Sequence, residues 1–147
     1  MIGAFAHLSD VGAARGRARE ALSRAGFDVS QVHRQAIGLT TLDLRMMELA
    51  RCLATQPRLI LMDEPLAGLS GDGGGVMMQL VRRLRDQDVT VVIIEHTMQA
   101  LVQLTDRLVV LDHGEKVAEG APEIVTRQPQ VIEAYLGKRW LSQLEDE

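Results

Sequence analysis

The stretch Leu59-Ile60-Leu61-Met62-Asp63-Glu64-Pro65 decides the fold of this chain. Its four apolar residues predict a strand that is buried on both faces, as a central strand of a parallel sheet must be. Two carboxylates follow that strand directly, at the carboxyl end where open α/β sheets bind their ligands. The stretch therefore predicts an α/β protein with an acidic site at one edge of its sheet.

The same pattern returns 31 residues after Glu64, where Val91-Val92-Ile93-Ile94 runs into Glu95 and His96. Two buried strands that each deliver ionisable side chains suggest a nucleotide hydrolase. The sequence has no G-x-x-x-x-G-K-[ST] motif to hold the phosphates, however. Gly12 and Gly16 are too close together to form one, and an arginine follows where the lysine is needed. The sequence therefore carries only one part of such a site.

Composition narrows the function classes. With 147 residues, of which 46% are apolar and 24% charged, the chain has the size and composition of one globular domain. A net charge of −4 argues against a nucleic-acid partner, because phosphate binding needs a basic surface. Apolar runs fall far short of the ~20 residues of a membrane span, and the N-terminus lacks the basic flank of a signal peptide. We therefore expect a cytoplasmic protein without direct membrane insertion.

Cys52 is the single cysteine, which excludes an internal disulfide and fits a reducing compartment. We expect its side chain on the apolar side of a helix, where a buried thiol is usually inert.

Apolar periodicity and turn residues predict alternating helices and strands. Thr40 with Asp43 fits a capping box, so a helix begins at Thr40 or Thr41, and Pro57 ends it. Further helices are expected over residues 13–26, 76–85, 98–104 and 131–136, and strands over residues 59–62, 89–94, 107–111 and 116–119. Residues 112–115 have the composition of a hairpin turn. The alternation predicts a parallel sheet with right-handed crossovers.

Asp63 and Glu64 can divide the work of phosphoryl transfer. One carboxylate orients the ligands of a magnesium ion, and the next, less exposed to solvent, polarises the attacking water. His96 can donate a hydrogen bond to a terminal phosphate. The alternative is that these residues have structural roles only, in which the two acids cap the following loop and the histidine packs against its neighbours. The spacing of the two strands favours the functional interpretation.

The glycine-rich segment Gly71-Asp72-Gly73-Gly74-Gly75 precedes an expected helix and admits two interpretations. Glycines before a helix N-terminus can bind phosphate. This segment lacks the lysine and the hydroxyl residue of such a loop, and the strand before it already ends in the acids. We therefore interpret it as a flexible connector.

Several motifs, in this order, resemble those of an ATP-binding-cassette (ABC) ATPase. Leu59–Pro65 looks like the Walker B strand with its catalytic glutamate, Ala67–Ser70 like the D-loop, and Glu95–Met98 like the switch-histidine loop. Asp106–Gly120 together with Pro129–Gly137 is similar to the ATPases of branched-chain amino acid importers. The resemblance extends over about residues 36 to 137.

The resemblance implies a partial P-loop NTPase fold of the RecA-like type. Its parallel sheet with flanking helices would lack the Walker A strand and follow part of a helical subdomain. Residues 1–56 would belong to the helical subdomain, 57–120 to the ATPase core, and 121–147 to a C-terminal helical extension. Without the Walker A strand, strands 89–94 and 107–111 are expected to keep unpaired edges.

Ligands, partners and location are implied in the same way. The ligands would be ATP and Mg²⁺, once a Walker A half is supplied. Permease subunits and a second ABC ATPase subunit would be the partners, at the cytoplasmic face of the inner membrane.

The resemblance also assigns roles to single residues. Glu64 would be the general base, Asp63 a member of the magnesium shell, and His96 the contact to the γ-phosphate. The signature and D-loop positions, which in the family bind nucleotide in a dimer, would be Thr40, Thr41, Leu42, Asp43, Gly68, Leu69 and Ser70.

Three features depart from the family pattern. Walker A and the Q-loop would precede Met1, since Met1–Phe5 is similar to the stretch just after the Q-loop. The signature, normally Leu-Ser-x-Gly-Gln, is Leu-Thr-Thr-Leu-Asp, which places a bulky Leu42 and a negative Asp43 where the family approaches phosphate. Thr97 replaces the aspartate that usually follows the histidine. The site for this chain's own nucleotide therefore lacks its phosphate cradle, and the signature that would bind a partner's nucleotide is altered.

These observations leave three hypotheses. In the first, the chain is the C-terminal half of an ABC ATPase of the branched-chain amino acid importer type, which neither binds nor hydrolyses ATP alone. In the second, it is a non-catalytic module that docks on another ABC ATPase or a permease, as the altered signature favours. In the third, it is one half of a split ATPase whose Walker A half is a separate chain.

Overall fold

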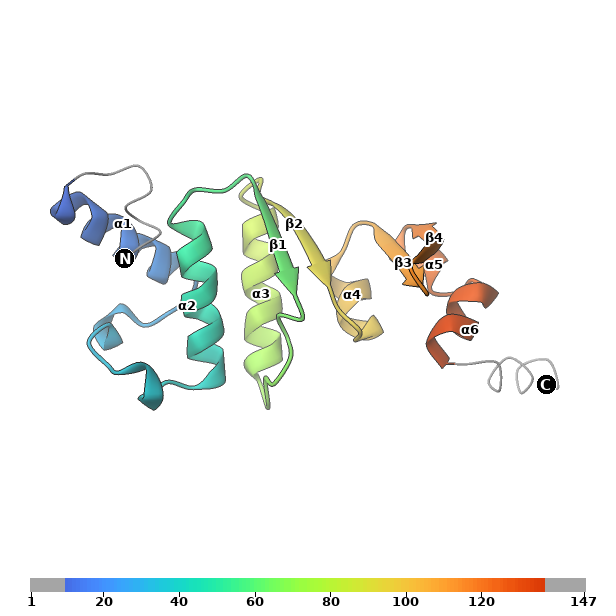
Figure 1. Ribbon diagram of the computed structural model, residues 1–147, viewed down its shortest axis with the longest axis horizontal. Coiled ribbons are helices and arrows are strands. Elements are labelled where there is room, and N and C mark those ends of the chain that lie inside the picture. Colours follow the sequence, from blue (N-terminus) through green and yellow to red (C-terminus); the bar gives the residue numbers. More distant parts are fainter. Residues whose placement is uncertain (1–9, 137–147) are drawn as a thin grey trace. The chain divides into compact units, whose positions relative to one another are not determined.

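The computed structural model describes residues 10–136, and the chain divides into two compact units, Met1–His96 and Thr97–Glu147. The first unit contains α1 (Val11–Arg24), the 3-10 turns η2 (Val29–Gln31) and η3 (Ala36–Gly38), α2 (Thr41–Leu53), β1 (Leu59–Asp63), α3 (Gly73–Arg85) and β2 (Thr90–Ile94) (Figure 1). The second contains α4 (Met98–Leu104), β3 (Leu108–Asp112), β4 (Glu115–Gly120), α5 (Pro122–Val125) and α6 (Pro129–Leu136). The expectations for Met1–Phe5 and for the end of the 121–147 extension lie outside the described residues.

Local capping signals fix the ends of the first two long helices. The Asp10 side chain accepts a hydrogen bond from the Ala13 N–H at the start of α1, and Gly26, with a φ of +79°, follows its end. Thr40 and Asp43 form the predicted capping box of α2, in which each side chain accepts the other residue's backbone N–H. Both helices are confirmed, with ends within a few residues of those predicted.

One apolar core holds the first unit together. It joins α1 and α2 to β1 and α3, and its buried members include Ala14, Ala21, Met46, Leu49, Leu53, Ile60, Met77, Leu80 and Leu84. The buried faces of the helices α1, α2 and α3 thus meet in one cluster. This core carries β1 and α3, the two elements on either side of the acidic stretch.

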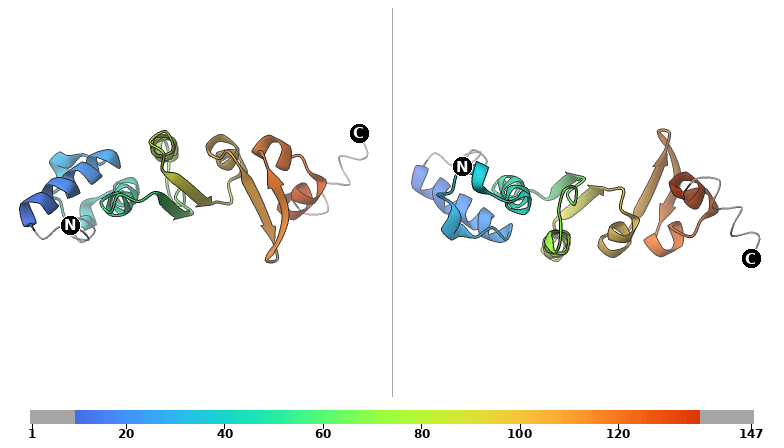
Figure 2. Two further views of the ribbon diagram at one scale, coloured as in Figure 1. Left: turned by 90° about the horizontal axis from the view of Figure 1, so that it is seen from above. Right: turned by 90° about the horizontal axis from the view of Figure 1, so that it is seen from below.

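β1 and β2 form a parallel two-stranded sheet, in which Leu59 lies opposite Thr90 and Asp63 opposite Ile94. α3 connects the two strands and lies against one face of the sheet (Figure 2). This arrangement confirms the predicted α/β fold with a parallel sheet and flanking helices. Among the described strands β2 pairs only with β1, and β3 only with β4, so both keep the unpaired edges that were expected.

The prediction that residues 59–62 are buried on both faces is wrong. Ile60 lies in the core, whereas Leu59 and Leu61 are 52% and 72% exposed. Val92 and Ile94, next to them on β2, are exposed as well. Side chains alternate between the faces of a strand, so the described residues cover one face of this sheet only. An apolar run implies burial on both faces only where a second layer packs on the sheet.

Two smaller expectations also fail. The segment 71–75 is not simply a connector, because Gly73–Gly75 forms the first turn of α3. The buried face of that helix outweighs the low helix propensity of glycine. Cys52 is exposed, because Leu49 and Leu53 take the inward positions on the same part of α2.

The second unit contains an antiparallel hairpin and short helices. β3 and β4 meet at the predicted turn, where His113 and Gly114 have φ values of +48° and +84°. Two successive positive φ angles are what a tight two-residue hairpin loop requires. Glu119 accepts hydrogen bonds from Lys116 at 2.7 Å and Arg107 at 2.9 Å. The hydrogen bond from Lys116, and then the charges of both cations, hold the pKa of Glu119 below its ordinary value.

No helix within residues 10–136 combines the length and the apolar character that crossing a bilayer requires.

The exposed face of the β1–β2 sheet makes a prediction about association. Replacing Leu61 and Ile94 together by threonine should reduce self-association of the chain, because it removes apolar surface while a β-branched residue with high strand propensity occupies both positions. The matched control is Ile60→Thr, which buries a hydroxyl and should cost roughly 2–4 kcal/mol of folding free energy. Light scattering and urea denaturation measure the two effects. Self-association that is unchanged in the double variant would contradict the prediction.

Candidate functional site

The candidate site lies where β1 and β2 end. The two strands are parallel, so their carboxyl ends meet at the same edge of the sheet. The pairing continues one residue beyond β1, because the Glu64 N–H donates to the Ile94 carbonyl at 2.9 Å. Asp63, Glu64, Glu95 and His96 are thereby held next to one another by backbone hydrogen bonds.

Glu64 has an unusual backbone conformation. Its φ is +44°, in the left-handed region that residues with a side chain seldom adopt. The chain turns sharply after it, since the Ala67 N–H donates to the Glu64 carbonyl at 3.0 Å. Strained backbone of this kind gathers at functional sites, where neighbouring structure holds it in place.

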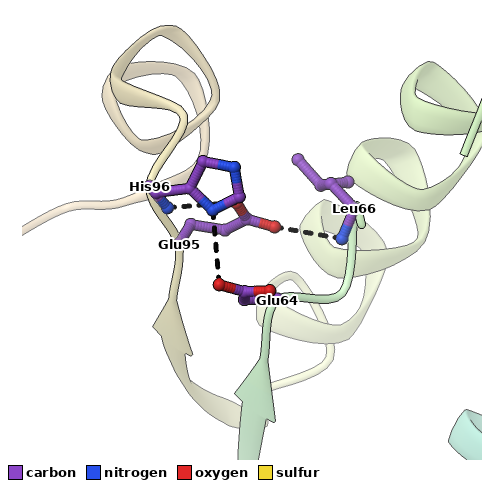
Figure 3. A network of polar contacts seen from close by, with 4 residues as sticks. All are labelled: Glu64, Leu66, Glu95 and His96. Atoms are coloured by element: carbon purple, nitrogen blue, oxygen red, sulfur yellow. Dashed lines mark hydrogen bonds and ion pairs between the residues drawn. The ribbon is translucent and has the colours of Figure 1, made fainter. Parts of the chain in front are cut away.

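Glu64 and His96 come together at the carboxyl ends of the two parallel strands. The Nδ1 atom of His96 lies 3.4 Å from Oε1 of Glu64 (Figure 3). A carboxylate oxygen attracts this nitrogen when the nitrogen carries a proton. Both acids are open to solvent, because the Glu64 side chain is 53% exposed and Asp63 is exposed as well. The same open sheet face that exposes Leu61 leaves both acids in contact with solvent.

Glu95, which lies beside His96, was assigned no role of its own from the sequence. Its side chain is only 1% exposed. One carboxylate oxygen accepts the Leu66 N–H at 3.0 Å, and the other accepts the His96 N–H at 3.2 Å. The second oxygen also lies 3.9 Å from the His96 Nδ1 (Figure 3). The only signal in the sequence was an acidic residue directly after an apolar strand. It could not indicate the contact with Leu66, which is 29 positions away.

The signature positions lie at the start of α2, which faces the same end of the unit as the carboxyl ends of β1 and β2 (Figure 1). Asp43 does not extend its charge freely toward a ligand: its Oδ2 accepts from the Thr40 N–H at 3.0 Å and the Thr40 hydroxyl at 2.8 Å. Leu42 packs partly against the core. The Thr40 and Asp43 side chains therefore already bind backbone N–H groups at the start of α2 that could otherwise bind a ligand.

The D-loop positions follow Glu64 on the same side. Gly68 has a φ of +74°, and a Cβ there would lie 3.8 Å from the Thr41 methyl group. The structure thus places this loop beside the signature helix. Leu69 packs partly against the core, whereas Ser70 is exposed.

The residues present fit only part of a Mg-ATP site. Asp63 is an exposed carboxylate of the kind that binds Mg²⁺ together with substrate phosphates. Within the described residues, no group of three or more acidic, histidine or cysteine side chains could hold a metal by itself. The glycines 73–75 are part of α3, and no lysine and hydroxyl residue accompany them. A phosphate cradle is therefore not built from these residues.

The capping box makes a prediction about stability. Asp43→Ala should lower the free energy of unfolding by about 1 kcal/mol, because the Thr40 N–H loses its acceptor. Glu48→Ala, on an exposed position of the same helix, is the control and should cost less than about 0.5 kcal/mol. Urea denaturation followed by circular dichroism measures both. Equal effects of the two substitutions would show that the cap does not stabilise α2.

Comparison with known proteins identifies the relatives of this chain. A model of the family described as branched-chain amino acid ATP-binding cassette transporter matches residues 115–140. The chain is 36% identical over 143 residues to the high-affinity branched-chain amino acid transport ATP-binding protein LivG of Salmonella typhimurium. That match covers 92% of this chain and 56% of LivG. It is 41% identical over 95 residues to BraF of Pseudomonas aeruginosa, covering 64% of this chain and 37% of BraF.

A solved structure agrees with these matches. The ADP conformation of MJ1267, an ATP-binding cassette of an ABC transporter, superposes with a TM-score of 0.74 at 30% identity. The superposition covers 84% of this chain and 50% of the cassette. The chain thus spans about half the length of the relatives that it matches. By sequence and by fold, it belongs to the ATP-binding-cassette family and is homologous to the ATP-binding proteins of branched-chain amino acid transporters.

Proposed function

We propose that this chain provides the hydrolytic half of the nucleotide site in an ABC transporter ATPase of the branched-chain amino acid import type. The contact between Glu64 and His96, at the ends of two neighbouring parallel strands, carries the proposal. ATP hydrolysis needs a base and a phosphate contact close together, and these two side chains have the right chemistry for both roles.

In this proposal the residues divide the reaction between them. Glu64 accepts the proton of the attacking water, to which its exposed carboxylate is open. His96 would donate a hydrogen bond to the terminal phosphate, and Asp63 would help to hold the magnesium ion. A bound Mg²⁺ would neutralise charge on the phosphates. The left-handed backbone of Glu64 supports its role, since it fixes the direction in which the carboxylate leaves the strand.

The phosphate cradle must come from outside this sequence. P-loop proteins hold the β- and γ-phosphates with successive backbone N–H groups and a lysine, which no segment within residues 10–136 provides. The open face of the β1–β2 sheet and the unpaired edge of β2 are consistent with a neighbouring segment that packs there in the complete ATPase.

Partners and location are proposed from the relatives. LivG and BraF are named as branched-chain amino acid transport ATP-binding proteins. We therefore assign this chain to an assembly with permease subunits and a second ABC ATPase subunit, at the cytoplasmic face of the inner membrane. Signature and D-loop residues would face the nucleotide of that second subunit.

A second candidate function is a non-catalytic module that docks on another ABC ATPase or a permease. The capping contacts at the start of α2 favour it, because Thr40 and Asp43 bind each other's backbone N–H groups. A helix N-terminus whose N–H groups are already satisfied is a weaker phosphate site. Hydrolysis by a complete assembly distinguishes the two functions, and the following experiment measures it.

A test of the proposed function uses a complemented assembly, in which this 147-residue chain is joined to the N-terminal half of LivG. Glu64→Gln should lower phosphate release by roughly 100-fold or more, because the amide keeps the shape but cannot act as a base. Glu48→Gln, an exposed glutamate on α2, is the control and should leave the rate unchanged. Equal rates in the wild-type and Glu64→Gln assemblies would remove Glu64 from the catalytic role.

A further prediction concerns the chain alone. It should neither bind Mg-ATP tightly nor hydrolyse it, since the acids at the strand ends repel the phosphates and no cradle offsets this repulsion. Isothermal titration with Mg-ATP and a phosphate-release assay measure the two properties. Micromolar binding together with turnover by the isolated chain would overturn the division of the site into two halves.

A further inference from the structure

We infer that Glu95 is a positioning residue, which clamps the loop after β1 to the loop after β2 and so holds Glu64 opposite His96. The inference rests on the proposed function, but it assigns a role to a side chain that the proposed reaction does not itself use. Its carboxylate binds one N–H from each loop, Leu66 at 3.0 Å and His96 at 3.2 Å (Figure 3).

The backbone hydrogen bonds explain why a side chain is needed at this place. The ladder between the strands ends with the Glu64 N–H, which donates to Ile94. Pro65 has no N–H, and the sharp turn at Glu64 takes the chain away from β2. The next N–H belongs to Leu66, and the Glu95 carboxylate accepts it in place of a backbone carbonyl. Glu95 therefore extends the connection between the strands past the turn.

The burial of Glu95 indicates what the clamp is for. A carboxylate that is 1% exposed has lost nearly all its hydration, and such burial is costly unless the charge is well paired. Two backbone N–H groups and the nearby His96 ring replace the lost water. A glutamine would avoid the cost of burying a charge, but it would leave one acceptor oxygen for the two N–H groups, so the carboxylate is suited to hold both loops.

The clamp acts on both groups of the proposed site. Leu66 is two residues after Glu64, and its position limits how far the Glu64 turn can move. The other oxygen holds the backbone of His96 itself. Releasing Glu95 should therefore loosen the 3.4 Å contact between Glu64 and His96 without removing either group.

The test compares Glu95→Leu, which removes both acceptors, with Glu95→Gln, which keeps one. In the 147-residue chain, the Leu66 amide should exchange its hydrogen roughly 10- to 100-fold faster in Glu95→Leu and by a smaller factor in Glu95→Gln. Glu20→Gln, an exposed glutamate of α1, is the matched control and should leave this exchange unchanged. Exchange at Leu66 that is the same in all variants overturns the clamp.

The complemented assembly tests the catalytic consequence. Glu95→Leu should lower kcat by about tenfold or more while KM for ATP changes less than about twofold, because the residue positions the base and not the nucleotide. Glu95→Gln should recover part of kcat. A rise in KM with unchanged kcat overturns the positioning role. A wild-type assembly that does not hydrolyse ATP overturns the proposed function, whereas the exchange at Leu66 still decides whether the clamp exists.

Discussion

The parallel pairing of β1 with β2 determines where every ionisable group of the site lies. Its register sets Asp63 opposite Ile94, and one further hydrogen bond carries the pairing to Glu64. Residues just past the ends of paired parallel strands have little freedom to separate, which is why Glu64 and His96 meet without any direct connection in sequence. α3 makes the pairing possible, because it returns the chain to the start of β2 on one face of the sheet.

The face of the β1–β2 sheet that α3 leaves uncovered is a second feature of the site. The apolar residues on the open face, Leu61 and Ile94 among them, are the ones that a larger sheet protein would bury. In the relatives, about half of the length has no counterpart in this chain. Under the proposed function, one neighbouring segment of the complete ATPase would cover the apolar sheet face and supply the phosphate cradle.

Features encoded by neighbouring residues could be predicted from the sequence. The capping box of Thr40 and Asp43, the stop at Gly26 and the hairpin at His113 each depend on a few adjacent side chains, and all three are present. The exposure of Leu61 could not be predicted, because it depends on whether another layer covers the sheet. The hydrogen bond between Glu95 and Leu66 was missed for a related reason. The two residues are 29 positions apart, and neither residue type indicates the other as its partner. The pairing of Glu64 with His96 was within reach only because two similar strand ends could be compared.

The left-handed backbone at Glu64 sets protein stability and chemistry against each other. A φ of +44° suits glycine or asparagine better than glutamate, so the carboxylate is kept at a conformational cost of order 1 kcal/mol. Replacement of Glu64 by glycine or asparagine would therefore relax the turn while removing the proposed base. A copy of this sequence released from selection for hydrolysis has a downhill route to a more stable and inactive form.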